Sequence, residues 1–354
     1  MYGFSVFLGE ELKAETKEEI EKLSKAGFSS IFTSLHIPEE DASLYSKRLV
    51  KLGTWAKEYQ MELVADVSGN ALETMGLSLN DPMGILAAGV TALRVDFGFS
   101  NQEIAKVSHN IDVALNASTI NEEDVQELVT YKADFKRLTA FHNYYPRPDT
   151  GLEKAAFSKK NKWLHSMGFQ VAAFVPGNKQ LRGPLYQHLP TLESHRVKNP
   201  LASSIELKRD CFVDHVYIGD PSIDTFTVQQ FEAYEKEKLI RLRVETKRPS
   251  QMTEFILGKH QNRRDPAKNV IRSAEARNKL TETVKPNHND ATRLIGCVTV
   301  DNCLYGRYMG ETQVVITPLP ADKKVNVEAR VVEEDRDLLA CIEAGTFFLL
   351  EKTT

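Results

Sequence analysis

The chain has 354 residues, of which 42% are hydrophobic and 27% are charged, and its formal net charge is -4. This composition is typical of a globular protein with room for two domains, and it lacks the basic patch expected of a protein that binds nucleic acid or a membrane surface. The first residues, Met1 to Glu10, predict a strand rather than a signal peptide because no cationic segment precedes a short apolar run. No run reaches the roughly 18 apolar residues of a membrane span, so we expect a cytoplasmic protein.

The four cysteines form no CxxC pair and have no histidine cluster nearby. Together with the absence of an HxH or HExxH motif, this argues against a zinc site or a disulfide framework. We therefore expect reduced thiols, no metal and no cofactor.

Apolar, β-rich runs alternate with helical segments through the first two thirds of the chain. The runs are Phe4–Leu8, Ser30–Thr33, Glu62–Ala65, Ala92–Val95, Ile111–Leu115, Arg137–Phe141, Gln170–Phe174 and His215–Ile218. The helical segments include Lys17–Ala26, Ala42–Tyr59, Glu103–Val107, Glu122–Val129 and Glu153–Met167. This alternation predicts a (β/α)8 TIM barrel over residues 1–237. An open doubly wound sheet is the alternative, but no GxGxxG follows the first run.

Three predicted helix starts support this alternation of strands and helices. Pro38 precedes three acidic residues, which favours a first helical turn there. Ser100 and Glu103 have capping-box spacing, and Asn121 can cap the helix that follows it. We also expect a helix led by Thr150.

Beyond Glu237 the alternation ends. Residues 238–354 contain runs with partial period-2 patterning, which predict a small β-barrel or sandwich domain. The runs are Leu239–Glu245, Leu294–Val300, Gln313–Thr317, Val325–Val332 and Thr346–Leu350. Lys259–Pro286 is polar and predicts either a long loop or a short helix-strand insertion.

Polar residues follow most of the predicted barrel strands, at the end where TIM barrels place their chemistry. The densest stretch is Leu138–Gly151, which combines aromatic, amide, imidazole and guanidinium groups and predicts a sugar-binding wall; a surface loop is the alternative. The substrate-binding candidates at these strand ends are His36, Asn116, His142, Asn143, Tyr144, Arg147 and Asp220.

Asp66 and Asp96 are the candidate catalytic pair. Adjacent strands lie about 4.8 Å apart, so carboxylates at equal heights would lie roughly 5 to 8 Å apart. Such a pair can divide into an acid and an ionised partner, as glycoside hydrolysis requires. We assign the acid role to Asp96, near Phe97, and the ionised role to Asp66, near Ser68. The alternative is structural: an ion pair of Asp96 with Arg94, and helix capping by Asp66.

Arginines near these ends can bind an anion, since a guanidinium forms paired hydrogen bonds to phosphate. The candidates are Arg94, Arg147 and Arg182, although Arg182 can equally be solvent-facing. Asp220 and Glu193 are the reserve catalytic candidates. In the second domain, Arg307 either reaches the barrel mouth and contacts substrate or makes a structural interdomain contact.

Several runs together resemble one family: FSVFLGEE, IFTSLHIPEED, LRVDFG, LNAST, FHNYYPRPDTGL, FVPGN, RGPLYQHLPTLE, YIGDP and YGRYMGE. They are similar to the bacterial 6-phospho-N-acetylmuramidase family, formerly an uncharacterised "outer surface protein" family, over residues 4 to about 344. The resemblance implies an N-terminal TIM barrel and a C-terminal cyclophilin-like β-barrel. It also implies hydrolysis of the β-1,4 bond of 6-phospho-N-acetylmuramyl-N-acetylglucosamine in peptidoglycan recycling. It does not assign the catalytic pair.

Two other functions remain open at this point. One is a non-catalytic carbohydrate-binding or surface protein, against which the missing signal peptide argues. The other is a phosphosugar isomerase, aldolase or lyase on the same barrel, which would need a Schiff-base lysine or a metal at a strand end. The expected partner is a phosphorylated amino-sugar disaccharide, and the oligomeric state is not predicted.

Overall fold

The computed structural model describes residues 1–35, 42–95, 98–246, 251–287 and 291–353. The chain divides into two compact units, residues 1–228 and 229–354. The division falls inside helix α9 (Thr225–Glu237), whose last residue is the predicted domain boundary. That boundary stays a prediction.

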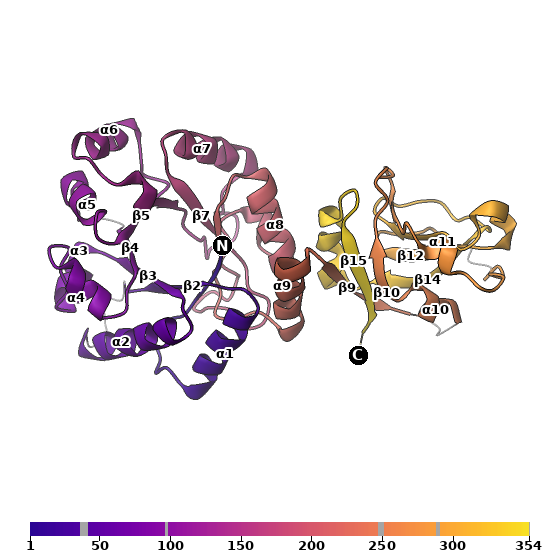
Figure 1. Cartoon of the computed structure of the whole chain (residues 1–354), viewed down its shortest axis with the longest axis horizontal. Coiled ribbons are helices and arrows are strands. Elements are labelled where there is room, and N and C mark those ends of the chain that lie inside the picture. Colours follow the sequence, from indigo (N-terminus) through magenta and orange to yellow (C-terminus); the bar gives the residue numbers. More distant parts are fainter. Residues whose placement is uncertain (36–41, 96–97, 247–250, 288–290, 354) are drawn as a thin grey trace. The chain divides into compact units, whose positions relative to one another are not determined.

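The first unit is a closed barrel of eight parallel strands in chain order, which confirms the predicted TIM barrel (Figure 1). The strands are β1 (Tyr2–Ser5), β2 (Ser30–Ser34), β3 (Glu62–Val67), β4 (Ala92–Val95), β5 (Asp112–Asn116), β6 (Leu138–Phe141), β7 (Gln170–Val175) and β8 (His215–Ile218). β1 pairs with both β2 and β8, so the sheet has no edge.

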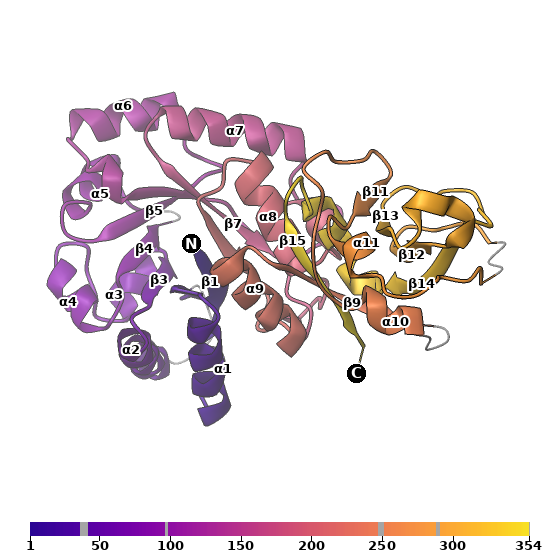
Figure 2. The same cartoon turned by 45° about the vertical axis from the view of Figure 1, so that its right-hand side comes forward.

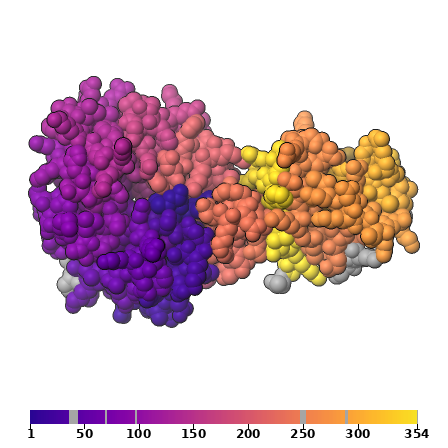
Figure 3. Space-filling model, in the orientation of Figure 1, coloured from indigo at the N-terminus to yellow at the C-terminus, as the bar shows by residue number. Residues whose placement is uncertain are grey.

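Helices surround this barrel and connect its strands (Figures 1 and 2). They are α1 (Ala14–Lys25), α2 (Ala42–Glu58), α3 (Gly69–Thr74), α4 (Pro82–Ala87), α5 (Asn101–Val107), α6 (Glu122–Thr130), α7 (Lys154–Ser166), α8 (Pro200–Asp210) and α9, with short 3-10 turns η1 (Phe135–Arg137) and η2 (Glu193–His195). In the space-filling view of Figure 3 the colours of this unit follow one another around the barrel, so chain neighbours are also spatial neighbours.

The barrel strands are buried on both faces because helices cover the outside and side chains fill the inside. Four large rings meet in the interior: Phe32, Phe141, Phe174 and Tyr217. Phe141 packs edge-on against Tyr217, with ring centroids 4.9 Å apart, and against Phe174 at 5.1 Å. Since strand side chains alternate, residues two positions beyond these rings also face inward, toward the carboxyl end of the barrel.

The predicted helix caps at Ser100 and Asn121 are confirmed, each as a complete capping box. The helix expected from Thr150 begins instead at Lys154, with Glu153 as its cap. The hydroxyl of Thr150 donates to the carbonyl oxygen of Arg147 at 2.6 Å and so closes a turn instead of capping a helix. The start predicted at Pro38 lies outside the described residues.

The second unit contains a seven-stranded sheet within its described part, in the order β10-β15-β9-β14-β12-β13-β11. Its strands are β9 (Ile240–Glu245), β10 (Gly258–Gln261), β11 (Val270–Arg272), β12 (Cys297–Asp301), β13 (Thr312–Val315), β14 (Val325–Val331) and β15 (Phe347–Lys352). The helical segments are α10 (Gln251–Ile256), α11 (Ala276–Lys279), η3 (Cys303–Tyr308) and η4 (Glu333–Cys341).

β9 and β15 pair in parallel and the other neighbours pair antiparallel, so the sheet is mixed. The polar stretch from Lys259 to Pro286 forms part of β10 together with β11 and α11, as the helix-strand alternative predicted. Across the described residues of both units, no helix has the length and apolarity needed to cross a membrane.

Candidate active site

Three polar residues lie side by side at the carboxyl ends of β2, β3 and β4. The strand register aligns Ser34 with Asp66 and Asp66 with Arg94. Arg94 Nη1 donates to Asp66 Oδ1 at 2.6 Å, and Ser34 Oγ donates to Asp66 Oδ2 at 3.4 Å. All three side chains are buried. The buried guanidinium thus compensates the charge of the buried carboxylate.

Arg94 extends this network across the barrel mouth to β6. Its Nη2 donates to Oδ1 of Asn143, and its guanidinium lies over the Phe141 ring, 5.9 Å from the centroid. Its Nε is buried and has no hydrogen-bond partner in the described part of the chain. A buried donor without a partner is costly, so this nitrogen is a donor that a bound substrate can satisfy.

A second group joins the loops that follow β1, β6 and β7. Arg182 Nη1 donates to the hydroxyl oxygen of Tyr144 at 2.6 Å, and the guanidinium stacks on Phe7 at 3.8 Å from the ring centroid. Tyr144 packs edge-on against Phe174. Burial raises the pKa of Tyr144, while Arg182 opposes that rise; Asp66 and Arg94 are also close enough to act on it. Tyr144 directly follows Asn143 in the chain, and Arg94 bonds to Asn143, so the two groups adjoin each other.

Asp220 organises the loop that carries Arg182. Its buried carboxylate accepts from the backbone N–H groups of Gly177 (2.9 Å), Leu189 (3.0 Å) and Arg182 (3.3 Å). Gly177 is required at its position because a Cβ there would lie 2.6 Å from the carbonyl oxygen of Ser222. Asp220 was predicted to bind substrate, and the structure shows both of its oxygens occupied by backbone donors.

Asn143 is held from its backbone side by Thr191. The Thr191 hydroxyl donates to the carbonyl oxygen of Asn143 at 2.8 Å and accepts from the N–H of Phe174 at 2.9 Å. Thr191 is fully buried, so this link between β7 and the loop after β6 is shielded from water. It fixes the position from which Asn143 reaches Arg94.

His142 and Asn116 were also predicted to bind substrate. His142 lies between the inward-facing Phe141 and Asn143, so its ring packs against Phe157 of α7 and bonds to Asn161 at 2.7 Å. Burial lowers its pKa to about 4. Asn116 is buried, and its Oδ1 accepts from the N–H of Ser118 at 3.0 Å. The structure gives both residues a role in holding the framework.

Arg147 and Glu193 lie on the loop after β6 and on η2. Arg147 is exposed, whereas Glu193 is bound by Arg196 and by the N–H groups of Asp149 and Gly151. The hydrogen bond from Arg196 is the main reason that the pKa of Glu193 falls to about 2. Both oxygens of Glu193 are held by these donors, so Glu193 anchors the loop, and this reserve catalytic candidate lies in a structural contact. Arg307, in the second unit, is exposed and stacks on Tyr308.

Asp96 and His36 lie outside the described residues, so the predicted pairing of Asp66 with Asp96 stays a prediction. The structural alternative for Asp66 was helix capping, but Ser68 caps α3 instead. The structural alternative for Arg94 was an ion pair with Asp96 on its own strand; in the described residues Arg94 pairs with Asp66 on the neighbouring strand. No group of three or more His, Cys, Asp and Glu side chains suited to a metal occurs among the described residues.

Residues 2–233 match the sequence profile described as 6-phospho-N-acetylmuramidase, N-terminal, and residues 239–351 match the corresponding C-terminal profile. The chain belongs to the 6-phospho-N-acetylmuramidase family. The N-terminal match covers the barrel. It therefore includes the network around Asp66 and Arg94 and the pair formed by Arg182 and Tyr144. No curated protein matches the chain significantly.

Two solved structures are similar over almost the whole chain of this 6-phospho-N-acetylmuramidase family member. One is a conserved Enterococcus faecalis protein of unknown function, 46% identical, with a TM-score of 0.93 and coverage of 99% of this chain and 96% of that one. The other is an uncharacterized B. cereus protein, 23% identical, with a TM-score of 0.74 and coverage of 99% of each chain. The second likeness shows the fold alone.

Proposed function

We propose that this protein is a glycoside hydrolase that cleaves the β-1,4 bond of 6-phospho-N-acetylmuramyl-N-acetylglucosamine in the cytoplasm, as a step of peptidoglycan recycling. The observation that carries the proposal is the Asp66–Arg94–Asn143 network at the carboxyl end of the barrel, beside Tyr144 and Arg182, in which Asp66 and Arg94 are buried. It provides a carboxylate and groups that can form hydrogen bonds with a sugar, close to the Arg182 guanidinium, and the family assignment supplies the substrate class.

Arg182 is the proposed phosphate ligand. Its guanidinium is half-buried and held by Tyr144 and Phe7, so less conformational entropy is lost when it binds an anion. Arg147 is exposed and lacks such support, which makes it the weaker candidate. The unpaired Nε of Arg94 is better placed for a hydroxyl or acetamido oxygen, because Asp66 already balances its charge.

The proposed chemistry is substrate-assisted. The acetamido oxygen of the muramyl sugar attacks C1 while the bond from C1 to the leaving oxygen breaks, and Asp96 transfers its proton to that oxygen. Asp66 accepts from the acetamido N–H and stabilises the positive charge that develops on the resulting ring. Water then attacks C1 while the bond from C1 to the acetamido oxygen breaks, and the proton that the water loses returns to Asp96, so that the acetamido group and the acid are both restored. Asp96 keeps its role on the sequence argument alone.

We also propose that the second unit is cyclophilin-like, as the family resemblance implies. A mixed sheet in this part of the chain supports the proposal. A shared fold would carry no isomerase activity with it, because function resides in the site rather than in the fold.

The test is to incubate the purified protein with the phosphorylated disaccharide and, in parallel, with the same disaccharide lacking phosphate, and to follow the sugars by mass spectrometry and proton NMR. We expect release of N-acetylglucosamine from the phosphorylated substrate only. Binding without cleavage would replace the hydrolase with a carbohydrate-binding protein, and equal cleavage of both sugars would remove the phosphate site.

A further inference from the structure

Arg196, the residue after η2, lies where the loop after β6 meets the loop after β7. Its side chain is buried, and all three nitrogens of its guanidinium donate hydrogen bonds. Nε and Nη2 donate to the two carboxylate oxygens of Glu193, each at 2.6 Å. The other bonds, of 2.8 to 3.2 Å, go to four backbone carbonyl oxygens, those of Tyr145, Arg147, Gln187 and His188. One guanidinium thus bonds to both loops.

Glu193 extends this contact along the loop after β6. Its Oε1 accepts from the N–H of Asp149 at 3.1 Å, and its Oε2 accepts from the N–H of Gly151 at 2.7 Å. Glycine is required at 151, because a Cβ there would lie 2.6 Å from Glu193 Oε2. We call the pair of Arg196 and Glu193 the loop clamp. Loss of either member would leave the charge of the other without its partner.

Both loops contain backbone that depends on such support. Asp149 has a φ of +66°, Tyr186 of +52° and His188 of +62°, in the left-handed region that residues with a side chain rarely adopt. Such conformations persist only where the surrounding contacts hold them. The loop clamp bonds directly to the N–H of Asp149 and to the carbonyl oxygen of His188. It therefore stabilises one strained position in each loop.

The clamped segments flank the contact between Tyr144 and Arg182. Arg196 bonds to the carbonyl oxygen of Tyr145, the residue after Tyr144, and to the segment that follows Arg182 in the other loop. The hydroxyl oxygen of Tyr144 accepts from Arg182 at 2.6 Å across the same two loops. The separation of the loops therefore determines where the Arg182 guanidinium points.

We propose that the loop clamp positions Arg182 for the phosphate group of the substrate. This role rests on the proposed function and adds to it a pair of positioning residues. The N–H groups of Arg196 are already used by Glu193 and by backbone carbonyl oxygens, so Arg196 acts on the substrate through Arg182 and not by contact. Binding groups that are fixed in advance lose less conformational entropy when the ligand arrives.

The test is a double-mutant cycle of Arg196→Gln with Arg182→Ala, measured by steady-state kinetics on the phosphorylated disaccharide. In the wild-type background we expect Arg182→Ala to raise KM at least about tenfold. In the Arg196→Gln background the same change should raise KM less than about threefold, because Arg182 is no longer held where the phosphate binds. A tenfold effect in both backgrounds would show that the clamp contributes to stability alone, and it would overturn the proposal.

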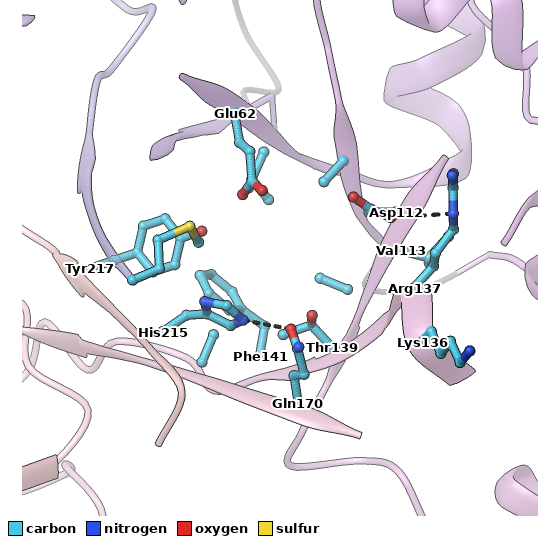
Figure 4. A pocket seen from close by; sticks show the side chains of 15 residues that line it. Glu62, Asp112, Val113, Lys136, Arg137, Thr139, Phe141, Gln170, His215 and Tyr217 are labelled. Carbon is cyan, nitrogen blue, oxygen red and sulfur yellow. Dashed lines mark hydrogen bonds and ion pairs between the residues drawn. The ribbon is translucent and has the colours of Figure 1, made fainter. Parts of the chain in front are cut away.

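Glu193→Gln is the second variant, in case Arg196→Gln does not fold. It keeps the size of a half-buried side chain and should reduce the KM effect of Arg182→Ala in the same way. Arg137→Gln is the matched control. Arg137 directly precedes β6 at the amino end of the barrel, where it pairs with Asp112 at 3.8 Å and lines a separate hollow (Figure 4). In this background Arg182→Ala should keep its full effect.

Hydrogen–deuterium exchange of the free protein tests the clamp without substrate. We expect the N–H groups of Asp149 and Gly151 to exchange at least about tenfold faster in Arg196→Gln than in the wild type, and at the wild-type rate in Arg137→Gln. Unchanged exchange in folded Arg196→Gln would overturn the proposal.

Failure of the proposed function gives a different result. If the wild type binds the phosphorylated disaccharide without cleaving it, the hydrolase function is wrong, and the same cycle is measured as dissociation constants by isothermal titration. The expected loss of the Arg182→Ala effect in the Arg196→Gln background would then still support the positioning role. Absence of binding by the wild type would overturn both.

Discussion

Arg94 and Asp66 lie opposite each other on neighbouring strands, with Nη1 and Oδ1 2.6 Å apart, and both side chains are buried. A buried ion pair of this kind is weak evidence for stability, because desolvation offsets most of the Coulomb attraction. Its position at the carboxyl end of a TIM barrel, with Asn143 as the next partner, instead favours a functional role.

The first prediction concerns Asp66. Asp66→Asn keeps the shape of the side chain but removes the charge proposed to stabilise the acetamido group. We expect kcat on the phosphorylated disaccharide to fall at least about a hundredfold, the size typical for loss of a catalytic carboxylate. Steady-state kinetics below the melting temperature of the variant measure this effect.

Asp112→Asn is the matched control, since Asp112 is also paired with an arginine but lies at the amino end of the barrel. It should retain near wild-type kcat. If Asp66→Asn is folded and also retains near wild-type kcat, the Asp66–Arg94 pair is structural.

The second prediction separates two arginines. We expect Arg182→Ala to raise KM for the phosphorylated substrate by at least about tenfold with a smaller change in kcat, because loss of a remote anion ligand affects ground and transition states alike. Arg147→Ala, which removes an exposed arginine from the neighbouring loop, should change KM less than about threefold. The opposite ranking would move the phosphate site to the loop after β6.

The third prediction concerns the loop anchor. Asp220→Ala removes the acceptor of three backbone N–H groups, and we expect at least about 3 kcal/mol of destabilisation, since each buried donor left unpaired costs roughly 1 to 3 kcal/mol. KM should rise as well, because Arg182 loses its support. Asp224→Ala, in the same region but half-buried, should cost only about 1 kcal/mol. Thermal melting and kinetics compare the two variants, and equal destabilisation would contradict the anchoring role.

The fourth prediction is a pH dependence. His142 has a pKa of about 4 in the folded protein, whereas an unperturbed histidine has about 6.5. As the pH falls, His142 therefore binds its proton at a higher pH in the unfolded chain than in the folded protein. The contribution of His142 to stability is complete above about pH 6.5 and is lost as the pH falls toward 4.

Between pH 7 and pH 5, the melting temperature of His142→Gln should accordingly fall by less than that of the wild type. His215, whose pKa is also lowered to about 4 by burial, leaves part of the dependence in the variant. Identical melting profiles over this pH range would show that His142 is not titrating as a buried neutral ring.

The sequence by itself determined the barrel, the β-rich second part and the family. Regular alternation of apolar runs with capped helices leaves few topologies open, and the caps at Ser100 and Asn121 act within one helical turn. Such local signals are readable because the interacting residues are three or four positions apart.

Only the tertiary structure decided how the strand-end residues are used. Asp66 pairs with a residue 28 positions away, and Asp220 accepts from N–H groups 31 to 43 positions away. Strand alternation places Asn143 in the site and turns its neighbour His142 toward α7. Which partner satisfies a buried charge depends on register and distance across strands, and these follow from packing of the whole barrel rather than from any short stretch of chain.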